Sequence, residues 1–156
     1  MKRSFFAKTF AFTAGAALAL SLAPTVKADD KGCSNAILRG TFAYTSTGAI
    51  ATPPAIAGPF VEVGTQSFDG NGGTTATAMS SQNGNISPLT VTGTYTVNPD
   101  CTGTMTLQVT FPGIPAFPLD VYFVVDDGGD EFQAIETDAG LVITRIGRRL
   151  FKGRAI

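Results

Sequence analysis

Apolar and polar residues alternate along most of the chain, with the two-residue period of a half-buried β-strand. The clearest example is the stretch 91–111, where alternation leads up to Tyr95 and resumes at Met105. Between them, Asn98-Pro99-Asp100 predicts a tight turn, because proline presets φ and the flanking side chains can bond to nearby backbone. We therefore predict a β-hairpin with Cys101 at its corner.

The same alternation recurs in short segments separated by turns rich in Gly, Pro or Asn. The predicted strands are 41–47, 59–68, 74–80, 89–97, 105–111, 119–126, 131–137 and 141–146. Before them, Ser34 can cap a helical turn that Gly40 ends, and the proline-rich stretch 48–58 predicts a loop. Apolar spacing of helical period is absent after residue 28.

This pattern predicts an all-β fold, a single antiparallel barrel of about eight strands, with a β-sandwich as the alternative. We favour the barrel because closure removes exposed strand edges. The interior of such a barrel is about wide enough for side chains or for one small ligand.

The first 28 residues resemble a secretory signal peptide and are set aside from the fold. Basic residues at 2, 3 and 8 precede an apolar run at 9–22, and Val26-Lys27-Ala28 fits a cleavage site. The run is shorter than the roughly 20 apolar residues of a membrane-spanning helix. We expect a secreted or periplasmic protein with one domain at 29–156 and no stable membrane insertion.

Charge and cysteine content narrow the picture further. Removal of the leader takes four of the 11 basic residues and leaves seven against 12 acidic ones, a net charge of −5. A negative domain of this kind is not expected to bind nucleic acid. Cys33 and Cys101 are the two cysteines, and an even count in an exported protein predicts a disulfide between them.

Three motifs together resemble small secreted bacterial proteins of uncharacterised function. They are Cys33-Ser34-Asn35-Ala36-Ile37-Leu38-Arg39-Gly40-Thr41-Phe42, Gly64-Thr65-Gln66-Ser67-Phe68-Asp69-Gly70-Asn71-Gly72, and the hairpin from Gly93 to Thr104. The resemblance implies a calycin-type barrel, similar in architecture to allene oxide cyclases. It implies a fold and no chemistry, and no catalytic residue of the cyclases can be carried over. Gln66 departs from the apolar residue expected in such a strand.

The residue types that are missing exclude several chemistries. The sequence has no histidine, which rules out Ser-His-Asp and Cys-His catalysis and histidine-ligated zinc. Neither a P-loop nor a Rossmann glycine pattern occurs. We expect no metal site and no cofactor, and no catalytic signature shows whether the protein is an enzyme. The carboxylates at 126–131 are typical of a solvated hairpin turn, with a calcium loop as the alternative.

Glu62 is the candidate residue for chemistry inside the barrel. It shares one face of its strand with Gln66 and Phe68, whereas Val61 and Val63 share the other face. Because a buried glutamate is rare, we favour the Val face as internal, which places Glu62 and Gln66 on the surface. In the alternative, the Phe face is internal, and a desolvated Glu62 can act as a general acid or orient a ligand. A bulge at Gly64 can also switch the faces midway.

The stretch 145–154 holds five of the seven basic residues of the mature chain. We interpret it as a final strand and a solvated tail whose charge offsets the acidic segment 120–138. The alternative is a contact with an anionic surface such as lipid headgroups.

Three functional hypotheses follow. The first is a binding barrel for a small apolar molecule, with candidate ligand-binding residues Glu62, Gln66, Phe68, Tyr95, Met105 and Phe123. The second is a cofactor-free enzyme of isomerase or cyclase type that uses Glu62. The third is a structural envelope or matrix protein whose barrel is filled by its own side chains.

Overall fold

The computed structural model describes residues 32–150, with the side chain of Asp127 excepted. The proposed leader at 1–28 and its cleavage site lie outside the described residues, as do Lys152 and Arg154 of the basic stretch. Three short 3-10 turns occur in the described part: η1 (Asn35–Leu38), η2 (Pro54–Ile56) and η3 (Asp127–Gly129). Among these residues, no helix has the length and apolar character needed to cross a membrane.

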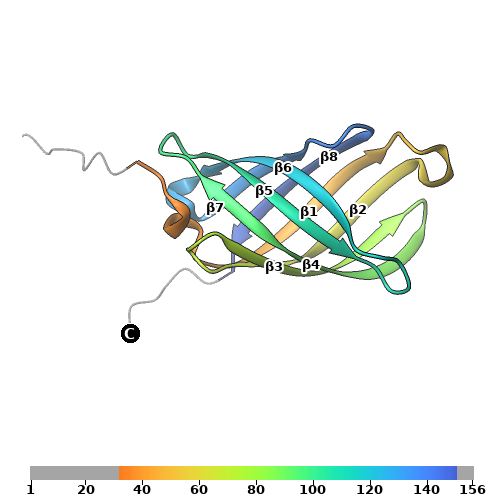
Figure 1. The fold of residues 1–156 in the computed structure, drawn as a ribbon, viewed down its shortest axis with the longest axis horizontal. Helices are drawn as coiled ribbons and strands as arrows, with labels where there is room; N and C mark the ends of the chain where they lie inside the picture. Colours follow the sequence, from red (N-terminus) through yellow and green to blue (C-terminus); the bar gives the residue numbers. More distant parts are fainter. Residues whose placement is uncertain (1–31, 151–156) are drawn as a thin grey trace, which may run out of the picture. The chain divides into compact units, whose positions relative to one another are not determined.

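Eight antiparallel strands form a closed barrel in sequential order, as Figure 1 shows. The strands are β1 (Gly40–Ile50), β2 (Gly58–Phe68), β3 (Gly73–Gln82), β4 (Asn85–Val97), β5 (Thr102–Thr110), β6 (Phe117–Asp126), β7 (Glu131–Glu136) and β8 (Leu141–Arg149). The predicted barrel is confirmed and the sandwich alternative is wrong, because β1 pairs with β8 from Phe42↔Arg149 to Ile50↔Leu141.

The ends of the barrel differ. Turn η1 lies at one end, which we call the η1 end, and the loops β1–β2, β3–β4 and β5–β6 lie at the other, which we call the loop end (Figure 1). The predicted loop at 48–58 is shorter than expected, since β1 continues to Ile50 and β2 begins at Gly58. Proline supplies no backbone N–H, which explains why the ladder stops on either side of Pro53 and Pro54.

The predicted helical turn is present as η1, but Ser34 makes no side-chain cap. Asn35 instead ties the turn to β4. Its Oδ1 accepts a hydrogen bond from the backbone N of Val97 (2.7 Å), and its carbonyl accepts one from the Tyr95 hydroxyl (3.0 Å). Leu38 is then completely buried and closes the η1 end of the barrel.

The predicted disulfide joins Cys33 to Cys101. It lies at the corner of the β4–β5 hairpin, where the backbone N of Cys101 donates to the carbonyl of Asn98 (3.0 Å). The Asp100 carboxylate accepts from the backbone N of Thr102, as expected for this turn. The bond and a backbone contact from Cys33 N to the carbonyl of Pro99 (3.0 Å) pin the start of the domain to the hairpin.

The orientation that we favoured for β2 is wrong. Val61 and Val63 are 47% and 62% exposed, whereas Glu62 is 5% exposed and Gln66 is completely buried. The Phe face is therefore internal. Pairing with β1 runs without a slip through Tyr44↔Gly64, so no bulge switches the faces. The rarity of buried glutamate misled the prediction, because the groups that satisfy Glu62 and Gln66 come from other strands.

Aromatic side chains fill the half of the barrel nearer the η1 end. The rings of Phe42 and Phe68 meet edge to face with their centroids 5.4 Å apart, and those of Phe68 and Tyr95 are 5.0 Å apart. Phe132 also packs against Phe42 and Phe68. A second and smaller apolar cluster of Ile50, Phe60 and Ile143 lies toward the loop end. The interior thus has a packed half and a more open half.

We predict that loss of the disulfide destabilises the domain. The bond spans 68 positions of sequence, for which the chain-entropy model gives on the order of 4 kcal/mol of stabilisation. A Cys33→Ser/Cys101→Ser double variant should lose about that much free energy of unfolding in urea titrations followed by circular dichroism. Ser34→Ala is the control and should be nearly neutral, since Ser34 is exposed and makes no cap. A double variant as stable as the parent would contradict this prediction.

Candidate functional site

A layer of buried polar side chains crosses the interior between the two halves. We call it the polar layer and define it as Tyr44 and Ser46 of β1, Glu62 and Gln66 of β2, Glu136 of β7 and Arg145 of β8. These four strands are consecutive around the barrel because β1 pairs with β8. Alternation along each strand turns all six side chains inward, where each must find a partner or carry a desolvation penalty.

Arg145 organises the polar layer. Its Nε donates to the hydroxyl of Ser46 (3.0 Å), its Nη1 to Oε1 of Gln66 (3.4 Å) and its Nη2 to Oε1 of Glu136 (3.2 Å). The guanidinium also lies over the ring of Tyr44, 4.6 Å from its centroid. Every guanidinium nitrogen therefore has a protein partner, which allows a charge that is 3% exposed to remain inside the barrel.

In the described part of the basic stretch, each arginine pairs with a carboxylate. Arg145 faces inward, Arg148 pairs with Glu131 (2.8 Å), and Arg149 pairs with Asp130 (3.0 Å). Arg149 also donates to the carbonyls of Ile37 and Gly129 and so holds η1 against the barrel. The expectation that these charges offset the acidic segment is confirmed for the three arginines.

Glu62 accepts a hydrogen bond from the hydroxyl of Tyr44. Burial raises the pKa of Tyr44 above its usual value, and the negative charge of Glu62 raises it further. Tyr44 therefore stays protonated and remains a donor to Glu62.

Glu136 is the least satisfied member of the polar layer. Burial raises the pKa of its carboxyl from 4.5 to about 7, although Arg145 opposes the rise. One oxygen, Oε1, accepts from Arg145, whereas Oε2 is the only buried side-chain nitrogen or oxygen of the described residues that has no hydrogen-bond partner. Burying a carboxylate oxygen without a hydrogen bond costs desolvation free energy. A donor that reached this oxygen would offset much of that cost.

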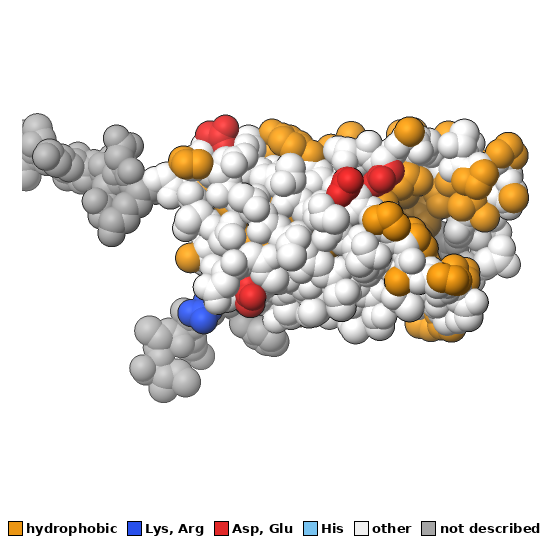
Figure 2. All heavy atoms as spheres, in the orientation of Figure 1, with side chains coloured by type: hydrophobic (Ala, Val, Ile, Leu, Met, Phe, Trp, Pro, Cys, Tyr) orange, Lys and Arg blue, Asp and Glu red, His pale blue; other side chains and the backbone are white. Residues whose placement is uncertain are grey.

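A cavity of about 410 Å³ adjoins the polar layer on the side of the loop end. Glu62, Glu136 and Arg145 are its charged lining residues, and the other walls are mainly apolar. The apolar lining residues are Ile50, Ile56, Phe60, Leu89, Val91, Val109, Phe111, Ile114, Phe117, Leu119, Leu141 and Ile143. Figure 2 shows hydrophobic side chains gathered around a hollow at this end. The volume falls within the usual range of small-molecule sites, about 300–1,000 Å³.

The mouth of the cavity is itself apolar. Ile56 from η2 and Ile114 from the β5–β6 loop both line it, and they are 46% and 54% exposed. The rings of Phe111 and Phe117 stack across the same loop, 6.1 Å apart and nearly parallel. An entering molecule would therefore meet hydrophobic side chains first and the polar layer last.

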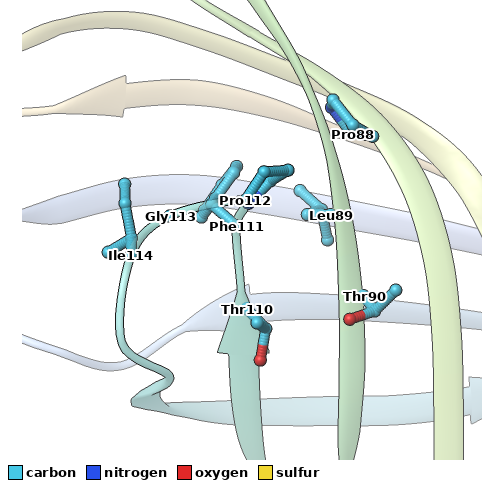
Figure 3. Close-up of a pocket in the computed structure, with 8 residues that line it drawn as sticks. All are labelled: Pro88, Leu89, Thr90, Thr110, Phe111, Pro112, Gly113 and Ile114. Carbon is cyan, nitrogen blue, oxygen red and sulfur yellow. The ribbon is translucent and has the colours of Figure 1, made fainter.

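A second hollow, of about 480 Å³, lies outside the barrel between β4 and the β5–β6 loop. Figure 3 shows Phe111 and Pro112 of this loop beside Leu89 of β4. None of its lining residues carries an ionisable side chain. Since it offers no charged group to fix the orientation of a ligand, we place the candidate site in the interior cavity.

The candidate residues from the sequence separate into two groups. Glu62 lines the cavity, and Gln66 lies in the polar layer, where its Nε2 donates to the Thr74 hydroxyl (3.1 Å). The aromatic and sulfur side chains lie in the packed half and are not among the cavity-lining residues. They are Phe68, Tyr95, Met105 and Phe123.

Sequence reasoning missed Glu136 and the inward position of Arg145. The sequence does contain a signal for Glu136. It lies on the same face of its strand as Phe132 and Ala134, which are both buried. For Arg145 the equivalent signal is that it lies on the same strand face as Ile143, which is buried. Neither signal shows that β7 and β8 come close to β1 and β2, which carry Tyr44 and Glu62. That arrangement follows only from the β1–β8 pairing.

Fold and site together define an eight-stranded antiparallel β-barrel with a charged layer inside and an apolar cavity at one end. No protein-family model, no curated protein and no solved structure matches the chain significantly.

We predict that Glu136 makes stability fall as pH rises from about 4.5 to about 7. Its carboxyl titrates near 4.5 when unfolded and near 7 when folded, so the folded state holds a proton in this window that the unfolded state has released. The loss across the window is on the order of 3 kcal/mol. Glu136→Gln should remove this component from the pH dependence of the free energy of unfolding, measured in urea.

Glu131→Gln is the matched control, because Glu131 lies on the same strand in a surface ion pair with Arg148. It should leave the pH dependence close to that of the parent. Identical slopes for the parent and Glu136→Gln would refute the assignment.

Proposed function

We propose that the protein binds a small, mainly apolar molecule in the interior cavity. The observation that carries the proposal is the cavity of about 410 Å³, with apolar walls and charged groups only at its inner end. Sites for small molecules share this composition, in which apolar walls give affinity and a few polar groups give orientation. The cavity also favours binding over the hypothesis of a structural protein with a filled barrel.

We also infer that the protein acts outside the cytoplasm. The disulfide between Cys33 and Cys101 is typical of an oxidising, extracytoplasmic compartment. The leader-like first 28 residues and the resemblance to small secreted bacterial proteins with calycin-type barrels support export to the periplasm or the medium.

Export predicts a processed N-terminus. In a bacterial host the protein should accumulate outside the cytoplasm, and Edman sequencing should begin at Asp29. A chain that is retained in the cytoplasm with residues 1–28 intact would contradict this prediction.

We predict that filling the cavity abolishes binding of an apolar probe. Val109 is buried and lines the cavity, so Val109→Trp places a large ring in the space that a ligand would take. The probe is N-phenyl-naphthylamine, a neutral dye whose fluorescence rises in apolar surroundings. Its affinity for Val109→Trp should be at least about tenfold lower than for the parent, a loss of about 1.4 kcal/mol.

Val142→Trp is the control, because Val142 is 67% exposed on the outside of β8. It should bind the dye as the parent does, and circular dichroism should show that both variants keep the β-fold. Equal binding by the parent and by Val109→Trp would show that the dye binds elsewhere and would refute the proposal for this cavity.

A second candidate function is cofactor-free acid–base catalysis in the same cavity, of isomerase or cyclase type. The observation in its favour is that two carboxyls, Glu62 and Glu136, line the cavity, and that the pKa of Glu136 is close to neutral. Native mass spectrometry of the protein from its source organism would identify a bound molecule. Recovery of that molecule unchanged after incubation favours binding, whereas conversion that Glu62→Gln abolishes favours catalysis.

A further inference from the structure

The charges that line the cavity do not balance. Two carboxylates, Glu62 and Glu136, face one guanidinium, Arg145. Each of these side chains is at least 95% buried, so water screens them poorly and the excess negative charge is costly. A proton on one carboxyl removes the excess, and so does a cation that enters the cavity.

One buried atom lacks the hydrogen bond that such a cation would supply. The Oε2 of Glu136 has no hydrogen-bond partner, while the other carboxylate, Glu62, already accepts from Tyr44. We infer that the ligand of the interior cavity is an apolar amine, whose ammonium group donates a hydrogen bond to Oε2 of Glu136. This inference rests on the proposed function, since it assigns the chemical class of the molecule bound there.

The apolar walls of the cavity indicate the chemistry of the rest of the ligand. Apart from the charged residues at the inner end and Gln82, the side chains that line the cavity are apolar. A molecule with one ammonium group and a hydrocarbon or aromatic body therefore matches the cavity, whereas one with several charges leaves some of them against apolar walls. A charge-assisted hydrogen bond to a carboxylate is also about twice as strong as a neutral one.

An anionic head group fits less well. Among the described residues, Arg145 is the only cation lining the cavity, and its three guanidinium nitrogens already donate to Ser46, Gln66 and Glu136. A carboxylate or phosphate at this site would add a third negative charge beside the two present. It would also compete with the bonds that hold Arg145 in place.

The titratable groups around Glu136 set the pH dependence of amine binding. Arg145 of β8 favours its charged form, whereas Glu62 of β2 and Asp138, which follows β7, favour its protonated form. Tyr44 of β1 remains neutral beside them. Since burial holds the pKa of Glu136 at about 7, amine affinity should fall as the pH is lowered through neutrality. The affinity for a neutral alcohol should change little.

The test uses three probes with the same body: phenylbutylamine, phenylbutanol and phenylbutyrate. Calorimetric titration of the parent at pH 8, where Glu136 is ionised, should give the amine an affinity about tenfold above that of the alcohol, with phenylbutyrate weakest. Glu136→Gln should reduce the preference for the amine over the alcohol to about twofold or less. Glu131→Gln, the surface control on the same strand, should keep it.

A second measurement needs no variant. Between pH 8 and pH 6 the amine stays charged, since its pKa is near that of lysine, about 10.4. Loss of amine affinity over this range in the parent, with constant alcohol affinity, would therefore report protonation of the site.

The outcomes separate the inference from the proposed function. If the alcohol binds but the amine has no advantage, or if the advantage survives in Glu136→Gln, the amine assignment is wrong and the binding function stands. Tightest binding of phenylbutyrate would place the head group on Arg145 and also overturn the assignment. If none of the three probes binds, both the assignment and the proposed binding function fail.

Discussion

Pairing between β1 and β8 is the constraint on which the rest of the molecule depends. It closes the sheet, gives the barrel an inside, and brings residues more than 70 positions apart into one layer. Because β1 pairs with β8 at this seam, Arg145 can reach Ser46 on the adjacent β1 and Gln66 on β2, one strand further. Without closure, Glu136, Glu62 and Arg145 would lie on open sheet faces in water, where their ion pair would contribute little.

Closure also accounts for the two unequal halves of the interior. At the η1 end the disulfide, the buried Leu38 and the contacts of Arg149 hold η1 against the barrel, and the aromatic rings fill the space behind it. At the loop end, the described side chains around the mouth leave a cavity. The polar layer separates these halves, so the same residues that terminate the packed core form the inner wall of the site.

The sequence was sufficient for the architecture, because alternation, turn residues and paired cysteines are local signals that agree with one another. It was insufficient for the inner face of β2. There the general rule that glutamate avoids burial was overridden by Tyr44, which donates to Glu62, and by Arg145, which binds the neighbouring Gln66. The candidate site suffered from the same limit. Glu62 could be identified as a candidate from the alternation of its own long and regular strand. The roles of Glu136 and Arg145 depend on which strands lie beside theirs, and no local sequence pattern specifies that.

Glu136 is a buried carboxyl inside a closed barrel, and its ionisation can be measured directly. Carbon-13 NMR of the side-chain carboxyl of Glu136, assigned by comparison with Glu136→Gln, follows its ionisation without any ligand. A midpoint near pH 7 is expected, because burial outweighs the attraction of Arg145. A midpoint near 4.5 would show that burial does not outweigh the attraction of Arg145, and it would contradict this account of the site.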